Sequence, residues 1–403
     1  MKIALETLGC KLNQAETEKL TRRFIEAGHT VVGRNDSPDI YILNTCTVTR
    51  TADSKSRHLA RMVKRRNPNV KVVLTGCYAE RAGEELAKLE EIDVVIGNEG
   101  KSSLLEQLTK TGLLLPTVNV TAPSSAKKHT RAFIKIQDGC QHFCTYCIVP
   151  YVRSREYSIK AEKIIDEIKQ RTQEGCKEIV LTGTRIGGYK IDGLVLTDLV
   201  GRILEETNIP RIRLSSLQPQ EISPELLKLW QDNRLCPHFH LSLQSGSASV
   251  LQRMHRRYTP ADYEKSIALI RKMVPDVAIT TDVIVGFPGE TDAEFEESYK
   301  FCEKIGFARI HVFPYSPREG TKAAAMAGQV PDKVKKERTD KMLALAAESA
   351  RKFREQFQGE MLDVLWEQET DKGVWSGVTG NYIRVYRKSE KNLNNKLDYN
   401  TMD

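Results

Sequence analysis

No window of this 403-residue sequence is continuously apolar over the thickness of a membrane, which argues against a membrane-spanning helix. The N-terminus, MKIALETLGCKLNQ, also lacks the apolar core of a signal peptide, so we expect a cytoplasmic protein with no membrane partner. The cysteines number nine, and an odd count argues against a framework of paired disulfides. In the cytoplasm thiols stay reduced, so they are available as metal ligands.

The sequence also lacks an internal repeat of fixed period and a strong charge of one sign. Its 61 basic residues exceed its 53 acidic residues by a net charge of +8. This mild excess is compatible with a polyanionic partner but does not require one. The length allows two or three domains, and the ordinary apolar and charged fractions argue against wholesale disorder.

The first 115 residues alternate short apolar runs with helical patterns, which predicts a domain with a parallel sheet covered by helices. The expected strands are Ile3–Leu8, Ile40–Asn44, Val70–Thr75 and Val94–Ile96, and the expected helices are Gln14–Ala27, Ala52–Arg66 and Glu80–Leu89. Cys10, Cys46 and Cys77 each come just after one of these strands. Because the carboxyl ends of parallel strands share one edge of a sheet, we expect these three cysteines to meet in space.

Residues 116–130 are rich in Pro, Ser and Thr without periodicity and are predicted to be a linker. A second alternation of strands and helices, over residues 131–358, predicts an incomplete β/α barrel with six strands instead of the usual eight. The expected strands are Phe133–Ile136, Glu178–Thr182, Arg211–Ser215, His238–Leu243, Ala278–Val285 and Arg309–Phe313. Cys140, Cys144 and Cys147 follow the first of them, at the end of a barrel where chemistry usually occurs.

The C-x3-C-x2-C spacing of Cys140, Cys144 and Cys147 indicates an iron–sulfur site. Three thiolates on a four-iron cluster leave one iron open to a substrate or cofactor, whereas four-cysteine clusters mostly carry electrons. The alternative is a zinc site with His142 as the fourth ligand, although structural zinc prefers C-x2-C pairs. For the N-terminal triad, the alternative is that buried cysteines fill the core. Three further cysteines lack partners at ligand spacing and are expected in the core: Cys176, Cys236 and Cys302.

The C-terminal residues 359–403 are predicted to form a small all-β domain after a helix over Asp332–Gln356. The expected strands are Met361–Trp366, Gly373–Ser376 and Tyr382–Tyr386. From Ser389 onward the chain is polar, so we expect a frayed tail without a closing strand, and a small barrel usually needs five strands. Arg384, Arg387 and Lys388 flank Tyr382 and Tyr386, a mixture of cations and aromatic rings that suits single-stranded RNA.

A C-x3-C-x2-C loop after the first strand of an incomplete barrel resembles the radical S-adenosylmethionine superfamily. The resemblance implies that Cys140, Cys144 and Cys147 hold a 4Fe-4S cluster whose open iron binds S-adenosyl-L-methionine. Reductive cleavage of this cofactor would then yield a radical that removes hydrogen from carbon. The same resemblance implies cofactor contacts at later strand ends, from Thr182, Gly183, Ser215, Gln244 and Gly286, with Arg257 as a further candidate.

Six separated segments resemble one branch of that superfamily, the methylthiotransferases. They are LGCKLNQAETE, LNTCTVTRTADSKSR, VVLTGCYAER, DGCQHFCTYCIVPYVRSRE, TDVIVGFPGET and HVFPYSPREGT. The resemblance implies an enzyme with an N-terminal cysteine domain, a radical barrel and a C-terminal RNA-binding β domain called TRAM. It further implies that Cys10, Cys46 and Cys77 are catalytic, because they hold a second 4Fe-4S cluster that carries the sulfur to be inserted. Two cofactor molecules would be used per product.

The residues after the first cysteine differ among the known branches of this family. Here CKLNQ, from Cys10, and CTVT, from Cys46, resemble the branch that acts on N6-threonylcarbamoyladenosine in tRNA, next to the anticodon. The isopentenyladenosine branch typically reads C-Q-M-N, and the branch that acts on a ribosomal-protein aspartate reads C-P-K-N. We therefore expect methylthiolation of threonylcarbamoyladenosine at carbon 2 of adenine, with the other two substrates as alternatives.

The expected partners are the anticodon stem-loop of tRNA and an electron donor such as flavodoxin or ferredoxin, whereas the sulfur donor cannot be inferred from the sequence. An alternative of another class is a zinc-stabilised RNA-binding protein without catalysis. Iron and sulfide analysis separates the two, since two clusters contain about eight irons.

Overall fold

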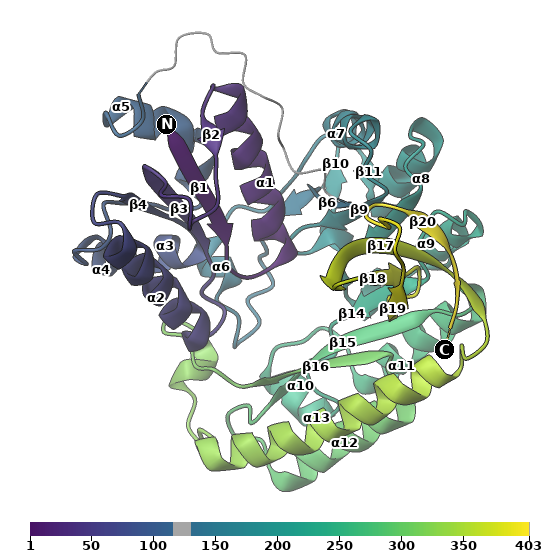
Figure 1. Ribbon diagram of the computed structural model, residues 1–403. Helices are drawn as coiled ribbons and strands as arrows, with labels where there is room; N and C mark the ends of the chain where they lie inside the picture. Colours follow the sequence, from purple (N-terminus) through teal and green to yellow (C-terminus); the bar gives the residue numbers. More distant parts are fainter. Residues whose placement is uncertain (116–129, 403) are drawn as a thin grey trace. The chain divides into compact units, whose positions relative to one another are not determined.

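The computed structural model describes residues 1–115 and 130–402, so all of the predicted linker except Thr130 lies outside the described residues. The chain divides into two compact units (Figure 1). The first, called the N-terminal unit, contains the described part of Met1–Lys127 with Asp138–Glu156 and Ser316–Thr321. The second, called the barrel unit, contains the described parts of Lys128–Gln137 and Lys322–Asp403 with Tyr157–Tyr315. The C-x3-C-x2-C segment thus groups with the N-terminal unit.

A five-stranded parallel sheet of order β2-β1-β3-β4-β5 forms the core of the N-terminal unit (Figure 1). Its strands are β1 (Lys2–Thr7), β2 (Thr30–Val31), β3 (Ile40–Thr45), β4 (Lys71–Gly76) and β5 (Val94–Ile96). Alternate side chains of β3 enter two apolar clusters, Ile40 and Ile42 on one face and Tyr41 and Leu43 on the other. Burial on both faces explains why these strands are nearly continuous apolar runs, and it confirms the predicted sheet.

Helices cover both faces of this sheet. On one face lie α1 (Lys11–Glu26) and α5 (Leu104–Lys110), and on the other lie α2 (Arg50–Arg66), α3 (Cys77–Arg81) and α4 (Gly83–Ala87). The predicted single helix over Glu80–Leu89 is wrong, because Ala82, at φ −131° and ψ 36°, separates α3 from α4. Tyr78 of α3 and Leu86 of α4 pack in the same cluster, so apolar periodicity does not reveal the break.

Six principal strands of the barrel unit form the predicted incomplete barrel. They are β6 (Arg131–Lys135), β9 (Glu178–Thr182), β12 (Arg211–Leu214), β14 (His238–Leu241), β15 (Ala278–Val285) and β16 (Arg309–Pro314). The sheets β6-β9-β12 and β13-β14-β15-β16 have only parallel pairs, and β13 (Ser216–Leu217) continues β12 after Ser215. The connecting helices include α7 (Ala161–Gln173), α8 (Leu196–Glu206), α9 (Pro224–Lys228), α10 (Ala248–Arg253), α11 (Pro260–Met273), α12 (Asp292–Ile305) and α13 (Asp332–Glu355).

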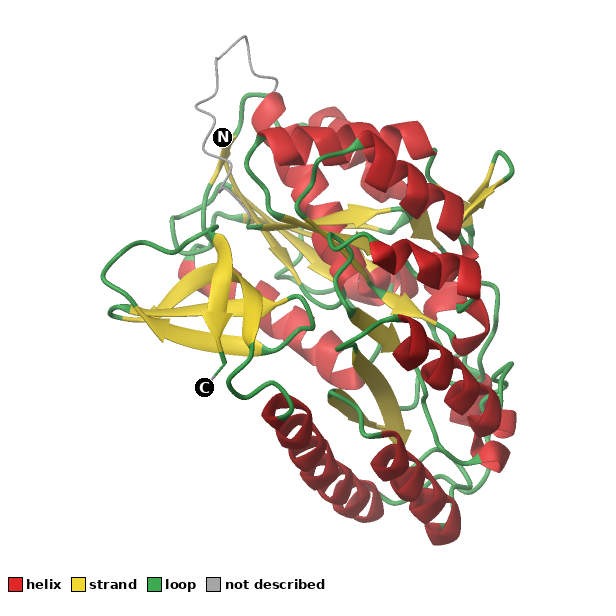
Figure 2. Cartoon of the chain, turned by 90° about the vertical axis from the view of Figure 1, so that its right-hand side faces the viewer, coloured by secondary structure: helices red, strands yellow, loops and turns green. Residues whose placement is uncertain are grey.

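The C-terminal residues form an antiparallel sheet of order β19-β18-β17-β20, visible as a curled set of strands in Figure 2. Its strands are β17 (Met361–Asp371), β18 (Val374–Thr379), β19 (Arg384–Lys388) and β20 (Leu397–Thr401). The expectation of a frayed tail is therefore wrong. Leu393 and Met402 are buried around Trp366, whose Nε1 donates to Asp398 Oδ1 at 2.6 Å. These apolar residues are too sparse in a polar stretch to produce a periodic pattern.

Among the described residues, no helix is both long enough and apolar enough to cross a membrane.

Candidate functional site

Cys10, Cys46 and Cys77 lie at the carboxyl ends of β1, β3 and β4, which are neighbours in the sheet. Cys10 is exposed at the N-terminus of α1, and Cys46 and Cys77 are buried. Burial raises the pKa of the Cys46 thiol to about 11, with smaller contributions from the nearby Cys10 and Cys77 thiols. The carboxyl ends of the three neighbouring strands thus carry the three cysteines on one edge of the sheet. A bound cation would favour their thiolate forms.

Two glycines allow the loops that carry these cysteines to approach each other closely. A Cβ added at Gly9, where φ is +104°, would lie 2.6 Å from Cys46 Cβ and 2.9 Å from its Sγ. A Cβ at Gly76, where φ is +96°, would lie 2.5 Å from Asn44 Oδ1. Both positions require glycine for its backbone freedom and for space.

The second triad lies on the irregular segment between Asp138 and α6 (Val149–Val152). Cys140, Cys144 and Cys147 are half-buried, and the Cys147 amide donates to the Cys144 carbonyl at 2.9 Å. Phe143, at φ 48°, packs edge-on against Tyr151 with ring centroids 5.9 Å apart. The tight turn keeps the three thiols within one short loop.

Among residues 1–115 and 130–402, no three His, Cys, Asp or Glu side chains are arranged to hold a single metal ion. The described residues therefore contain no preformed four-ligand zinc site of the structural kind. The ligands of a four-iron cluster bind separate irons and stand further apart than the ligands of one ion. Each of the two sets has three free cysteines, the number of protein ligands on a four-iron cluster with one open iron.

The Arg153 side chain contacts both cysteine-bearing segments. The sequence pattern does not predict this role for Arg153. Its Nη1 lies 2.9 Å from Glu16 Oε1 and 2.8 Å from Asp138 Oδ1. Its Nη2 donates to Asn13 Oδ1 at 2.9 Å, and its Nε donates to Cys77 Sγ at 3.4 Å. Arginine is usually exposed, so a charged residue near the C-x3-C-x2-C motif does not by itself indicate burial.

A second buried arginine lies beside Cys46. Arg318 Nη2 donates to Thr47 Oγ1 at 2.9 Å and also pairs with Asp53. Arg81 Nε donates to Thr47 Oγ1 at 2.8 Å, and its Nη2 pairs with Asp53 Oδ2 at 2.9 Å. The two arginines thus both bind Thr47, the residue after Cys46, and share the Asp53 carboxylate.

In the barrel unit, three predicted cofactor contacts lie at the carboxyl ends of neighbouring strands. Thr182 ends β9, Ser215 separates β12 from β13, and Gln244 follows β14. The buried Ser215 Oγ has no hydrogen-bond partner among the described residues, and Gln244 has the unusual φ of +69°. An unsatisfied hydroxyl and a strained residue at a barrel mouth are typical of a binding site. Gly183, next to Thr182, would place a Cβ 2.7 Å from the Gln137 carbonyl oxygen.

Gly286 and Arg257, the other two residues predicted to contact the cofactor, lie in different surroundings. A Cβ at Gly286, after β15, would lie 2.4 Å from Cγ of Lys335 in α13, so a protein side chain fills that space. Arg257 is exposed on the loop between α10 and α11. Both assignments stay predictions.

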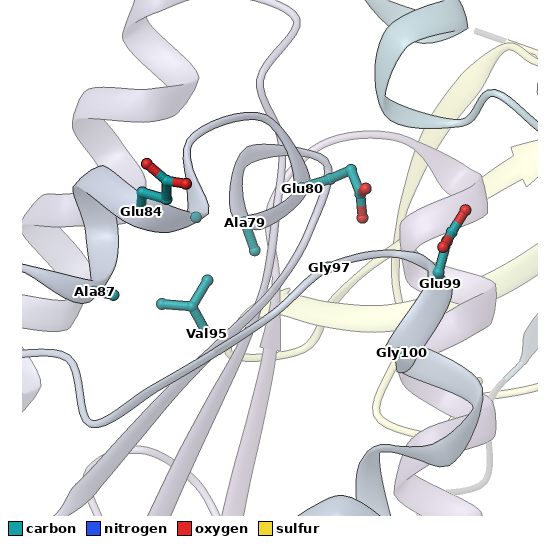
Figure 3. Close-up of a pocket in the computed structure, with 9 residues that line it drawn as sticks. Ala79, Glu80, Glu84, Ala87, Val95, Gly97, Glu99 and Gly100 are labelled. Atoms are coloured by element: carbon teal, nitrogen blue, oxygen red, sulfur yellow. The ribbon is translucent and has the colours of Figure 1, made fainter.

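The N-terminal unit contains a cavity of about 500 Å³ that the sequence did not predict (Figure 3). It lies beside α3, α4 and β5, and three of its lining residues are Glu80, Glu84 and Glu99. Carboxylates repel phosphate groups, so we assign this cavity no part in binding a nucleic acid.

The expected RNA-binding role of Tyr382 conflicts with its position. Its ring stacks on His238 with centroids 4.6 Å apart, and the Arg213 guanidinium lies 4.7 Å from its centroid. Tyr382 lies in the turn after β18 at a φ of +68°, and its ring faces His238 of β14. Tyr386 on β19 remains 56% exposed beside the exposed Arg387.

Comparisons with known proteins match nearly the whole chain. A profile described as "Radical SAM superfamily" matches residues 134–302, and one described as "Uncharacterized protein family UPF0004" matches residues 2–97. A protein of Aquifex aeolicus named threonylcarbamoyladenosine tRNA methylthiotransferase MtaB is 40% identical, over 98% of each chain. A protein of Endomicrobium trichonymphae named tRNA-2-methylthio-N(6)-dimethylallyladenosine synthase is 35% identical, over 97% of this chain and 94% of its own.

Among solved structures, the radical S-adenosylmethionine methyltransferase TsrM from Kitasatospora setae is similar in fold. The TM-score is 0.58 at 15% identity, over 80% of this chain and 77% of that one. At this identity the similarity concerns the fold alone.

Proposed function

Since this chain belongs to the radical S-adenosylmethionine methylthiotransferase family and is an enzyme, we propose that it methylthiolates N6-threonylcarbamoyladenosine in tRNA, next to the anticodon. The product is the 2-methylthio derivative, modified at carbon 2 of adenine. The observation that carries this choice is the 40% identity to a relative named for that substrate, against 35% to one named for dimethylallyladenosine. Family membership leaves the non-catalytic zinc alternative without support.

The family implies S-adenosyl-L-methionine and a 4Fe-4S cluster as cofactors. When bound, one cluster and one cofactor molecule supply the group that removes hydrogen, while a second cofactor molecule supplies the methyl group. We assign the cluster to Cys140, Cys144 and Cys147. At the barrel mouth the Ser215 hydroxyl, which has no partner among the described residues, is suited to orient the cofactor. The other residues assigned to the cofactor are Thr182, Gly183, Gln244, Gly286 and Arg257.

We assign a second 4Fe-4S cluster, which carries the sulfur, to Cys10, Cys46 and Cys77. The position of the three cysteines at the carboxyl ends of neighbouring parallel strands favours this assignment. The physical logic is that hydrogen removal and sulfur delivery need two centres. Two cysteine triads in one unit supply ligands for both.

The proposed partners are the anticodon stem-loop of tRNA and an electron donor such as flavodoxin or ferredoxin. Tyr386 and Arg387 on β19 are exposed and available to RNA bases and phosphates. We propose that the C-terminal β domain is a TRAM domain.

Nucleoside mass analysis of tRNA from cells with and without this chain tests the proposal. We expect threonylcarbamoyladenosine to gain one methylthio group only when the chain is present. A gain on isopentenyladenosine instead, or on a ribosomal protein, would refute the substrate but keep the reaction.

A further inference from the structure

The buried Arg153 side chain contacts three separate segments of the N-terminal unit, and the proposed reaction does not yet use it. It bonds to Asn13 and Glu16 of α1, to Asp138 before the second triad, and to Cys77 of the first triad. Only 7% of the residue is exposed, so these bonds are shielded from water. A side chain with partners in three segments fixes their relative positions.

The charges around Arg153 decide how it acts. Lys101 Nζ also pairs with Glu16, at 2.6 Å from Oε2. Arg153 and Lys101 thus share the Glu16 carboxylate, and Arg153 also pairs with Asp138. These ion pairs hold the guanidinium in place, with its Nε directed at Cys77 Sγ.

Asn98 makes a second connection between the same segments. Its Nδ2 donates to the Val152 carbonyl at 2.7 Å and lies 3.6 Å from Cys77 Sγ. Ile148, directly after Cys147, packs with Val152 and Cys77 in one apolar cluster. The chain that leaves the second triad is thus tied to the first triad by polar and apolar contacts.

We propose that Arg153 is a positioning residue that holds the segment after Cys147 against Cys77 and donates a hydrogen bond to the Cys77 sulfur. This inference rests on the proposed function, in which Cys77 is a ligand of the sulfur-carrying cluster. Hydrogen bonds to a ligand sulfur tune the reduction potential of a cluster, and neighbouring donors orient the ligand. A donor to sulfur stabilises the more negative, reduced cluster and so raises the potential.

Arg153→Lys and Arg153→Gln test the proposal with two readouts. The first is the potential of the second cluster, followed by EPR in full-length protein whose other cluster is removed by Cys140→Ala, Cys144→Ala and Cys147→Ala. The second is the ratio of methylthiolated nucleoside to 5′-deoxyadenosine in enzyme that holds both clusters. Lysine keeps the charge but loses the planar fork of donors, so it separates geometry from charge.

We expect both substitutions to lower the potential and to reduce the product ratio by about tenfold or more. The control is Arg202→Lys, at a half-buried residue of α8 paired with Glu162 and Glu206, which should change neither readout. If Arg153→Lys behaves like this control, the proposal is overturned.

Asn98→Ala decides the question should the Arg153 variants fail to fold, since it leaves Arg153 and both carboxylates in place. A reduced ratio supports the proposal, and an unchanged ratio overturns it. The unsubstituted enzyme distinguishes a failure of the proposed function from a failure of this inference. If it makes no methylthiolated nucleoside, the proposed function fails, whereas normal product with silent Arg153 and Asn98 variants refutes this inference alone.

Discussion

Glu178 and Arg213 form a two-point ion pair inside the barrel unit, with Nε to Oε1 at 3.0 Å and Nη2 to Oε2 at 3.2 Å, and neither side chain is exposed. Arg131 and Arg211 approach the same carboxylate at 2.8 and 3.1 Å. Arg213 also donates to the Gly380 carbonyl at 2.9 Å, so this cluster joins the barrel strands to the C-terminal sheet.

Replacing Glu178 by Gln should destabilise the protein strongly. The three arginines hold the pKa of Glu178 well below its usual range against the effect of burial, and the substitution removes the carboxylate that they share, although Arg131 keeps Glu367 and Arg211 keeps Asp363 as partners. Breaking a buried pair in this way costs about 3–5 kcal/mol. Thermal unfolding measures the loss, with Glu162→Gln, an exposed partner of Arg202, as the control. Equal melting temperatures for the two variants would contradict the role given to this cluster.

The stability difference between Glu290→Gln and wild type should depend on pH. Burial raises the pKa of Glu290 to about 7, although Arg338 and the amides of Gly286 and Phe287 favour its charged form. A carboxyl group with a raised folded pKa contributes stability that is complete below its unfolded pKa and is lost as pH rises through about 7. Relative to wild type, the free energy of unfolding of the variant should therefore rise by up to about 3 kcal/mol as the pH increases from about 4 to about 8.

Thermal unfolding of both proteins at each pH checks this expectation. The control is Glu297→Gln, an exposed residue on α12, the helix that begins two residues after Glu290. A difference that stays constant across the range for Glu290→Gln would show that folding does not shift the pKa of Glu290.

Gly9→Ala should disturb the first triad without unfolding the N-terminal unit. The new Cβ would lie 2.6 Å from Cys46 Cβ, so Cys46 must move. We expect iron per chain to fall from about eight to about four. Gly112→Ala is the matched control, because Gly112 has a similar positive φ, +72°, but open space around it. Full iron content in Gly9→Ala would mean that Cys46 is not a ligand.

The two triads should separate the two halves of the reaction. Cys77→Ala removes a ligand of the sulfur-carrying cluster, so we expect cofactor cleavage to persist while sulfur insertion is lost. Cys144→Ala should abolish both. Assays for 5′-deoxyadenosine and for methylthiolated nucleoside measure the two activities. Loss of 5′-deoxyadenosine formation in Cys77→Ala, with the other cluster still present, would argue against this division of roles.

The sequence predicts most of the elements that carry the cysteines, because apolar runs with turn residues after them are local signals. Cys10, Cys46 and Cys77 can be placed at one sheet edge for this reason. Contacts between distant segments leave no such signal. The ion pair of Arg153 with Glu16 is one example, and the contact of Lys335 with Gly286 is another. In both cases the sequence shows a charged residue, which usually indicates solvent exposure. Strand β20 is missed for a related reason, because Leu393 and Met402, the buried apolar residues on either side of it, pack with Trp366 far back in the chain.

The assigned substrate and reaction can be tested together with enzyme that holds both clusters and tRNA whose threonylcarbamoyladenosine carries deuterium at carbon 2 of adenine. We expect deuterium to appear in 5′-deoxyadenosine while the same nucleoside gains a methylthio group, with two cofactor molecules consumed per product. If no deuterium is transferred and this nucleoside stays unmodified, while isopentenyladenosine in a parallel tRNA is methylthiolated, the assigned substrate is wrong.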